Sequence, residues 1–304
     1  MKYFGQVVVT LTNSHILTND DALLRMLCQL WPDMPVGSWE IRPLTGLTQG
    51  SYYIANTTTN EVRQMVGRAQ TPQNEMLGVD RQRENQILRR LSSSGIAPKV
   101  VAMHGNWLLL EWFTGTKVKP GTLNQPALQQ PLAQTLAILH SHSPLGYPLQ
   151  LKKQIAFQWQ QIDRRRLSPR WLRLHKSFMA ARLPTVLKIA PAHMDVHSDN
   201  LLLTEKGLKL IDWEYAADID IGFSLAVLFK GNQWDEVQQN TFLDYYCTQA
   251  SGYSDIQLLQ QQIKRWEPWV IYMMLMWYEV RWQQTRDQQF LSLAHPLRQA
   301  FNLS

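Results

Sequence analysis

The segment at residues 193–214 reads HMDVHSDNLLLTEKGLKLIDWE and constrains the fold of this chain more than any other. Two short apolar runs, at residues 201–203 and 208–211, flank the turn-forming sequence Glu-Lys-Gly at residues 205–207. Apolar runs on either side of a glycine-containing turn of this length predict a β-hairpin. The hairpin is the element around which we interpret the rest of the sequence.

The polar residues around this hairpin are typical of a phosphoryl-transfer site. If the turn centres on Lys206, Asn200 falls opposite Asp212 at the open end of the hairpin, and Asp195 lies in the loop before it. Mg²⁺ prefers one or two carboxylates plus substrate phosphates to a full protein cage. A second carboxylate can orient a hydroxyl and take its proton. Asp and Asn clusters before strands are usually turns and caps, but their occurrence together with His193 favours the catalytic interpretation.

Three segments resemble a known group of kinases. HxDxxxxN followed by IDWE resembles the catalytic segment of the aminoglycoside phosphotransferase and choline kinase superfamily, whose members are relatives of protein kinases. More narrowly, HMDVHSDNLL, GLKLIDWEYA and WYEVRWQQTRDQQF resemble the bacterial thiamine kinases. The resemblance extends from about Gly46 to Phe290. It implies an α+β, two-lobed protein-kinase-like fold, with a small β-rich nucleotide-binding lobe (1–113) and a larger, mainly helical catalytic and substrate-binding lobe (114–304).

The resemblance assigns roles to the residues of the hairpin segment. Asp195 is expected to be the catalytic base, and Asn200 and Asp212 are expected to bind Mg²⁺, with ATP as the co-substrate. We expect His193 to brace the loop by hydrogen bonds. Asp220 matches a family aspartate that braces the catalytic loop, although the family often has a further acidic residue where this chain has Ser224.

In the first lobe, glycines between two predicted strands mark a candidate phosphate-binding loop. Gly46 and Gly50 lie in GLTQGSYYI together with Thr48 and Ser51. A glycine-bearing loop lets backbone N–H groups approach phosphate oxygens, but two glycines alone are a weak signal and favour an ordinary hairpin turn. The resemblance implies that this loop covers the nucleotide phosphates.

Three further positions complete the expected nucleotide site. Kinases place a cation on the next strand and pair it with a helix carboxylate. Arg68 matches the family cation best, with Arg63 as the alternative, and Glu84 matches the carboxylate, although a solvated surface glutamate is the competing interpretation. The apolar run WLLLEWF predicts a buried strand. The resemblance implies that the adenine contacts the backbone near Glu111 and Phe113, at the end of this run. We place the boundary between the two lobes at the same point.

Thiamine, the acceptor that the resemblance implies, carries a positive thiazolium ring beside a flat pyrimidine. Its site should offer aromatic faces and a carboxylate, since cation–π contact is strongest with tryptophan. We therefore expect Trp213 or Trp277 to stack on the acceptor, with Glu214 or Glu279 nearby. The competing interpretation is that each tryptophan is simply core. The late chain predicts two helices, at residues 255–266 and 268–284, and Pro268 is the first residue of the second.

Composition narrows the class of protein. The chain has 304 residues, of which 45% are apolar, so two lobes with their own cores are possible. Two cysteines are too few for a disulfide framework and fit a reducing cytoplasm. We expect no signal peptide, no membrane span and no membrane partner, because the start is polar and the most apolar stretch, 269–278, is too short.

The formal charge of +6 favours anionic partners. Residues 152–182 combine many bases with aromatic residues, which fits either a nucleic-acid surface or, as we expect, a helix pair with a solvated basic face. The predicted function is ATP-dependent phosphorylation of thiamine to thiamine monophosphate by a monomer that binds no nucleic acid. The alternatives are a kinase for choline, an aminoglycoside or another amino alcohol, or a non-catalytic nucleotide- or nucleic-acid-binding module.

Overall fold

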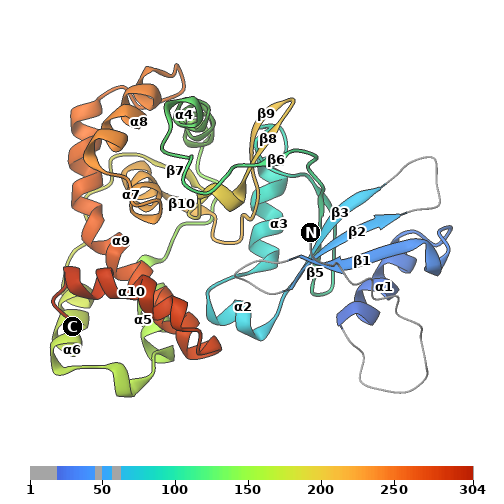
Figure 1. Ribbon diagram of the computed structural model, residues 1–304, viewed down its shortest axis with the longest axis horizontal. Coiled ribbons are helices and arrows are strands. Elements are labelled where there is room, and N and C mark those ends of the chain that lie inside the picture. The colour runs from blue at the N-terminus through green and yellow to red at the C-terminus, as the bar shows by residue number, and fades with distance from the viewer. Residues whose placement is uncertain (1–18, 45–49, 57–62, 304) are drawn as a thin grey trace.

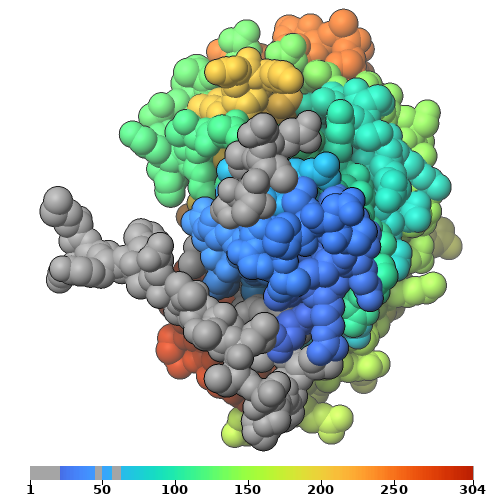
Figure 2. Space-filling view, turned by 90° about the vertical axis from the view of Figure 1, so that its right-hand side faces the viewer, coloured from blue at the N-terminus to red at the C-terminus, as the bar shows by residue number. Residues whose placement is uncertain are grey.

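The computed structural model describes residues 19–44, 50–56 and 63–303. It has a small β-rich lobe and a larger helical lobe side by side along the long axis (Figure 1). Seen end-on, the first lobe stands in front of a broader second lobe, whose hairpin rises beyond it at the top (Figure 2). The two-lobed α+β architecture predicted from the sequence is confirmed.

The first lobe is a five-stranded antiparallel sheet with helices on both sides, and its strand order is β1-β2-β3-β5-β4. The strands are β1 (Trp39–Pro43), β2 (Ser51–Asn56), β3 (Gln64–Ala69), β4 (Val100–His104) and β5 (Trp107–Glu111). The helices are α1 (Asn19–Leu30), α2 (Pro72–Met76) and α3 (Arg81–Arg90).

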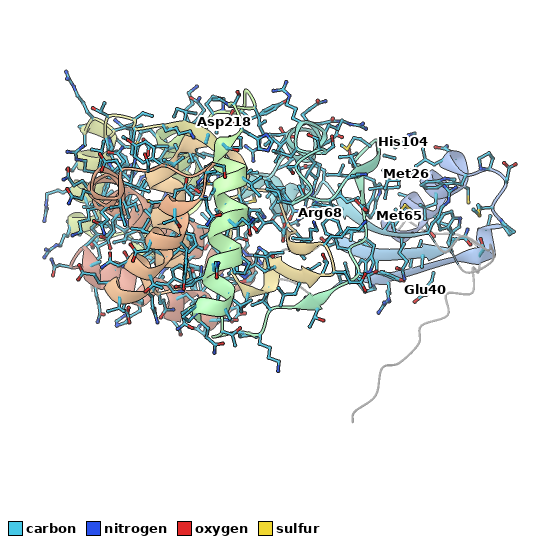
Figure 3. All side chains as sticks on the ribbon, turned by 90° about the horizontal axis from the view of Figure 1, so that it is seen from above. Met26, Glu40, Met65, Arg68, His104 and Asp218 are labelled. Carbon is cyan, nitrogen blue, oxygen red and sulfur yellow. The ribbon has the colours of Figure 1, made fainter. Side chains whose placement is uncertain are left out.

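Strand β5 is apolar from Trp107 to Leu110 because both of its faces are covered there. Leu109 points to one side of the sheet, where it joins Met26 of α1 and Met65 of β3 in a buried cluster (Figure 3). Leu108 and Leu110 point to the other side and join the core that continues into the second lobe. Side chains alternate between the faces of a strand, so a strand that is buried on both faces reads as a continuous apolar run.

The second lobe is mainly helical and holds two small sheets, β7–β10 and β6–β8–β9. Its helices are α4 (Pro126–Ser141), α5 (Leu151–Gln161), α6 (Pro169–Ala180), α7 (Ile221–Gly231), α8 (Glu236–Thr248), α9 (Ile256–Thr285) and α10 (Gln288–Ala300). Its strands are β6 (Thr116–Lys117), β7 (Ile189–Ala192), β8 (Leu201–Thr204), β9 (Gly207–Leu210) and β10 (Ala217–Asp220).

The predicted hairpin is β8–β9, but its register differs from the prediction. Thr204 pairs with Gly207, so the turn holds only the two residues between them, and Gly207 has a φ of +90°. Asn200 therefore lies opposite Ile211, whose N–H donates to the Asn200 carbonyl at 3.0 Å. Asp212, predicted to lie opposite Asn200, lies one residue beyond Ile211 and two residues beyond the last ladder pair, Leu201 with Leu210.

The connection between the lobes is fastened to this hairpin. β6 pairs with β8, and Gly115 just before it has little room for a side chain, since a Cβ there would lie 2.7 Å from the Leu203 carbonyl oxygen. A larger residue would push the connection off the hairpin. The lobe boundary after Phe113 stays a prediction.

Helix α9 is a single helix of 30 residues, not the two helices predicted. Pro268 lies inside it. A proline in a helix removes one backbone hydrogen bond and usually bends or ends the helix. Here Trp266 packs edge-on against Phe223 of α7 and Trp269 against Phe178 of α6. This packing on both sides of Pro268 keeps the helix continuous.

The basic segment at 152–182 forms the predicted helix pair, α5 and α6. Trp171 is fully buried, whereas Arg170, Arg173 and Lys176 stand on the exposed face. Among the residues that the structure describes, no helix is both long enough and apolar enough to cross a membrane.

Candidate active site

A cavity of about 890 Å³ lies between the two lobes. The first lobe contributes charged and backbone groups, and the second contributes the loop before β8, the segment after β9 and the exposed edge of α9. Arg68 points into the space between the lobes when the molecule is viewed from above (Figure 3). Of the predicted site residues, those that line the cavity are Ser51, Arg68, Glu111, Phe113, Asp195, Asn200, Asp212, Glu214 and Trp277.

The loop before β8 is held by a buried histidine. His193 donates from Nε2 to the Ile211 carbonyl oxygen at 2.9 Å and accepts at Nδ1 from the Asp195 N–H at 3.3 Å. Burial lowers the pKa of His193, which keeps its ring neutral and suits one donor and one acceptor nitrogen. His193 therefore joins the loop to the end of the hairpin by hydrogen bonds, as the sequence predicted.

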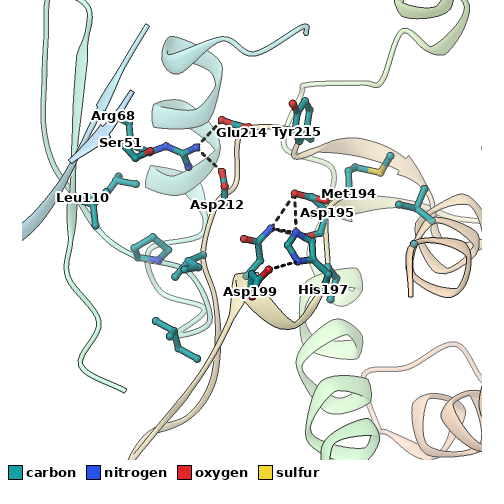
Figure 4. A pocket seen from close by; sticks show the side chains of 18 of the residues that line it. Ser51, Arg68, Leu110, Met194, Asp195, His197, Asp199, Asp212, Glu214 and Tyr215 are labelled. Atoms are coloured by element: carbon teal, nitrogen blue, oxygen red, sulfur yellow. Dashed lines mark hydrogen bonds and ion pairs between the residues drawn. The ribbon is translucent and has the colours of Figure 1, made fainter. Parts of the chain in front are cut away.

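This loop brings Asp195 close to Asn200 and to His197 (Figure 4). The Asn200 amide nitrogen donates to the Asp195 carbonyl at 2.9 Å and to its carboxylate at 3.0 Å. His197 lies beside them, with Nε2 3.5 Å from the Asp195 carboxylate. Burial lowers the pKa of His197, but the Asp195 carboxylate outweighs it and raises the pKa overall. Asp195 keeps part of its carboxylate open to the cavity and can accept a proton there.

Asp212 reaches the cavity from the other side, through a backbone reversal. Its φ of +66° is the left-handed conformation that non-glycine residues seldom adopt. One carboxylate oxygen, Oδ1, lies 2.5 Å from Arg68 Nη2. Burial raises the pKa of Asp212, but the Arg68 charge outweighs it and holds the pKa below the usual range. Asp212 is therefore an ionised carboxylate that faces the cavity.

Asn200 and Asp212 fit a magnesium ion by the chemistry of their donor atoms. Within residues 19–44, 50–56 and 63–303 there is no group of three or more His, Cys, Asp and Glu side chains suited to a metal. The donor set is instead one carboxylate and one amide, both lining the cavity. Such a sparse, all-oxygen set suits Mg²⁺, which takes most of its ligands from phosphates and water.

Arg68, the predicted phosphate-binding cation, is nearly enclosed by acidic side chains. It is 3% exposed, and its guanidinium donates to Glu84 at 2.8 Å, to Glu214 at 2.7 Å and to Asp212. Burial works to lower the pKa of Arg68, but these three carboxylates raise it, so the guanidinium stays charged. Glu84 is buried, which rules out the competing interpretation of a solvated glutamate.

Arg63, the alternative cation, is exposed and lies over the Trp31 ring with its guanidinium carbon 5.7 Å from the ring centroid. It does not line the cavity, so the geometry favours Arg68. The predicted loop residues Gly46 and Thr48 lie outside the described part of the chain. Gly50 has a φ of +101°, and its carbonyl accepts from the Ala69 N–H at 2.8 Å.

The expected adenine contacts lie at the end of β5. The Glu111 N–H donates to the Lys99 carbonyl at 2.9 Å, and its carboxylate accepts from the Lys99 N–H at 3.2 Å. Trp112 and Phe113 follow, and both line the cavity. The segment after Glu111 thus borders the cavity, and the Trp112 N–H is itself bonded to the Gln64 carbonyl at 3.4 Å.

The second lobe offers an aromatic and methionine surface. α9 contributes Met273, Met274, Trp277 and Tyr278, which follow one another on the side of the helix that faces the cavity. The Trp277 indole N–H donates to the Tyr215 hydroxyl at 3.0 Å. Burial raises the pKa of Tyr215 well above its ordinary value and raises that of Tyr278, so both phenols stay neutral.

Two residues expected to bind the acceptor lie elsewhere. Trp213 is 1% exposed, its indole N–H donates to the Leu210 carbonyl at 2.8 Å, and its ring packs against His193. The reversal at Asp212 turns Trp213 into the core, so the prediction that it contacts the acceptor is wrong.

Glu279 is likewise misassigned to the acceptor. It is fully buried and paired with Arg166 at 2.5 Å and Arg298 at 3.0 Å. Its position two residues after Trp277 turns it to another face of α9. It ties α9 to the segment before α6 and to α10.

Glu214 does line the cavity, but it is also bound to arginines. Burial and Asp212 raise the pKa of Glu214 to about 7, against the pull of those arginines.

Asp220 braces a segment other than the predicted one. It caps α7 through the Gly222 N–H at 2.7 Å and accepts hydrogen bonds from the Leu187 N–H and from Gln262. These partners precede β7 or lie on α9, not in the loop 193–200. Ser224, where the family often has an acid, bonds through its hydroxyl to His140 Nε2 at 3.0 Å.

Sequence reasoning missed two residues of the site. Arg81 is buried beside Glu84, three positions earlier on α3, a spacing that brings side chains together on a helix. Tyr215 directly follows the IDWE motif and reaches Trp277. The i,i+3 charge pair was visible in the sequence, whereas the contact between Tyr215 and α9 was not.

Comparison with known proteins agrees with this geometry. Residues 50–259 match the model of the phosphotransferase enzyme family. The thiamine kinase of Salmonella typhimurium (strain LT2) is 35% identical over 93% of this chain and 94% of its own length. That of Escherichia coli O81 is 34% identical over 91% and 93%.

Solved structures share the fold at low identity. The choline kinase of Streptococcus pneumoniae superposes with a TM-score of 0.74 at 16% identity, covering 94% of this chain and 99% of its own. An aminoglycoside 2'-phosphotransferase bound to GDP gives a TM-score of 0.61 at 18% identity, covering 93% and 97%.

Proposed function

Because the chain belongs to the phosphotransferase enzyme family, we propose that it transfers the γ-phosphoryl group of ATP to the hydroxyl of thiamine, forming thiamine monophosphate. The observation that carries the proposal is the similarity of nearly the whole chain to proteins named thiamine kinase. The cavity supports it with a base, a metal-binding pair and a phosphate-binding cation on facing walls.

Asp195 orients the acceptor hydroxyl and takes its proton as the oxygen attacks the γ-phosphorus atom, while the bond from that phosphorus to the β,γ-bridging oxygen breaks and ADP leaves. Asn200 holds that carboxylate through its amide nitrogen and, with Asp212, would hold Mg²⁺. When bound, the ion neutralises charge on the phosphates. Arg68 adds a fixed positive charge on the first-lobe side. Phosphoryl transfer needs little covalent chemistry from the protein, so such positioning and charge supply most of the rate.

The acceptor lies against the aromatic wall of the second lobe. Trp277 presents a flat face whose orientation is fixed by Tyr215, and Met273 and Met274 add polarizable apolar surface. A flat, positively charged ring gains cation–π and stacking contact on such a wall.

The direct test is an ATP-consumption assay with thiamine, choline and kanamycin as acceptors, with the product identified by mass. We expect turnover with thiamine and formation of its monophosphate. The fold shared with choline kinases makes choline the second candidate. Turnover on choline or kanamycin but not on thiamine would refute the assignment.

Removing divalent metal with EDTA should abolish turnover, and adding Mg²⁺ should restore it. The proposal also places the reaction in the cytoplasm, where ATP is available, and treats the enzyme as a monomer. Sedimentation of the purified protein tests the latter.

A further inference from the structure

Four buried charged side chains beneath the first-lobe wall form a closed ring. Arg68 donates from Nη1 to Glu84 at 2.8 Å and from Nη2 to Glu214 at 2.7 Å. Arg81 donates from a single nitrogen, Nη1, to the same two carboxylates, at 2.6 Å to Glu84 and 3.1 Å to Glu214. Positive and negative groups therefore alternate around the ring, and their charges sum to zero.

The ring joins the two lobes. Arg68 lies on β3 and Arg81 and Glu84 on α3, whereas Glu214 follows the catalytic hairpin of the second lobe. Each of the four is at most 3% exposed. Asp212 is attached to the ring from outside through Arg68, and it adds one negative charge that faces the cavity.

We propose that Arg81 is a positioning residue for nucleotide binding, which rests on the proposed ATP-dependent function. The positive charge of Arg81 compensates the negative charges of Glu84 and Glu214 on the side away from the cavity. Arg68 and Asp212 therefore keep pointing into the cavity. Without Arg81 a single cation would serve three buried or half-buried carboxylates. Removing one partner of a buried ion pair leaves an uncompensated charge, and Arg68 would be drawn back from the phosphates to neutralise it.

The ring geometry predicts that the two arginines differ in their tolerance to lysine. Arg81 bridges the two carboxylates with one nitrogen, which a lysine ammonium can imitate, while its Nε separately donates to the Ala69 carbonyl at 3.2 Å. Arg68 uses two nitrogens of its planar guanidinium, Nη1 for Glu84 and Nη2 for Glu214. The single ammonium group of a lysine cannot reproduce that arrangement. Arg81→Lys should therefore keep most of the nucleotide affinity and Arg68→Lys should lose it.

The test measures Mg·ATP dissociation constants by calorimetry at pH 8 for wild type, Arg81→Met, Arg81→Lys and Arg68→Lys. Arg89→Met is the matched control, since Arg89 is an exposed arginine of the same helix. We expect a rise of at least tenfold for Arg81→Met and Arg68→Lys, and less than threefold for Arg81→Lys and Arg89→Met. A wild-type constant in folded Arg81→Met, or equal losses in Arg81→Met and Arg81→Lys, would overturn the proposal.

A double-mutant cycle with Glu214→Gln separates positioning from general damage. Removing both charges restores the balance of the ring, so Arg81→Met/Glu214→Gln should bind Mg·ATP more tightly than Arg81→Met, and should fold even if Arg81→Met does not. In the kinetic assay, Arg81→Met should raise KM for ATP while KM for thiamine stays within twofold. Additive losses in the cycle, or equal rises in both KM values, would refute a positioning role. Wild-type turnover of thiamine tests the proposed function separately, because the binding measurements need no acceptor.

Discussion

The two walls of the cavity are built in different ways. The first-lobe wall is a network of buried charges, in which Arg68 and Arg81 are shared among carboxylates from both lobes. The second-lobe wall is an aromatic surface in which Trp277 is held by one hydrogen bond that its indole N–H donates to a neutral phenol, Tyr215. Removing one buried charge strands its partner at a cost of about 3–5 kcal/mol. Removing one ring mainly loses contact area.

Substitutions in the two walls should therefore affect different properties of the protein. Changes in the charged wall should disturb nucleotide binding and stability together. Changes in the aromatic wall should act on the acceptor alone.

The largest effect is expected between the walls, at Asp195. Asp195→Asn should lower kcat by at least about a hundredfold, since a positioned base contributes roughly 10²–10⁴. Mg·ATP affinity should remain near wild type, because neither wall is changed. Steady-state kinetics together with calorimetry measure both quantities. Retention of more than a tenth of the activity would remove Asp195 from the role of base.

The next largest effect concerns Asn200 and Asp212, the proposed metal-binding pair. Asp212→Ala should weaken Mg·ATP binding about a hundredfold and Asn200→Ala about tenfold, because a carboxylate contributes charge and an amide only a dipole. Calorimetry with and without Mg²⁺ checks the order. Unchanged Mg·ATP binding in Asp212→Ala would mean that the metal does not bind at the end of the hairpin.

The aromatic wall gives a sharper contrast, because the chain offers two tryptophans with opposite surroundings. Trp277→Leu should raise KM for thiamine roughly tenfold, a loss of about 1.4 kcal/mol, with KM for ATP and melting temperature nearly unchanged. Trp213→Leu should instead lower the free energy of unfolding, by roughly 2 kcal/mol or more, because it opens a cavity in the core and strands the Leu210 carbonyl. If Trp213→Leu raised KM for thiamine in a stable protein, the division between wall and core would be wrong.

The smallest effect tests how firmly the aromatic wall is held. Tyr215→Phe removes the hydroxyl that accepts from the Trp277 indole but keeps the ring. A hydrogen bond of this kind is worth about 1 kcal/mol, so KM for thiamine should rise about threefold to fivefold. In a Trp277→Leu background the same change should have no further effect. Equal losses in both backgrounds would show that Tyr215 acts on the acceptor directly.

The hairpin and the buried strand β5 were predictable because each depends on local pattern. Glycine in a short turn and apolar runs of strand length define such elements within a few residues. The fates of Trp213 and Glu279 were not predictable from the same rules. The burial of Trp213 depends on a left-handed φ at Asp212, which the sequence pattern does not predict. The burial of Glu279 depends on cations from distant segments, such as Arg298 on α10.

The charged wall shows the same limit. The match of Arg68 with Glu84 came from resemblance to kinases, but Glu214 was assigned to the acceptor because only its neighbourhood in sequence was visible. In the structure it shares Arg68 and Arg81 with Glu84 across more than a hundred residues of sequence. Buried charges find partners wherever the fold brings them, so their pairing is a property of the tertiary structure.

The attachment of the interlobe connection to the catalytic hairpin determines where the enzyme can bend to release its products. β6 is paired with β8, and Gly115 lies tight against Leu203. We therefore expect the chain from residue 115 onward to move with the second lobe as one rigid body. The pivot is confined to the few residues after β5. Opening the lobes would carry Asn200 and Asp212 away from Arg68 in one step, so release of the nucleotide and disassembly of its site would be the same motion.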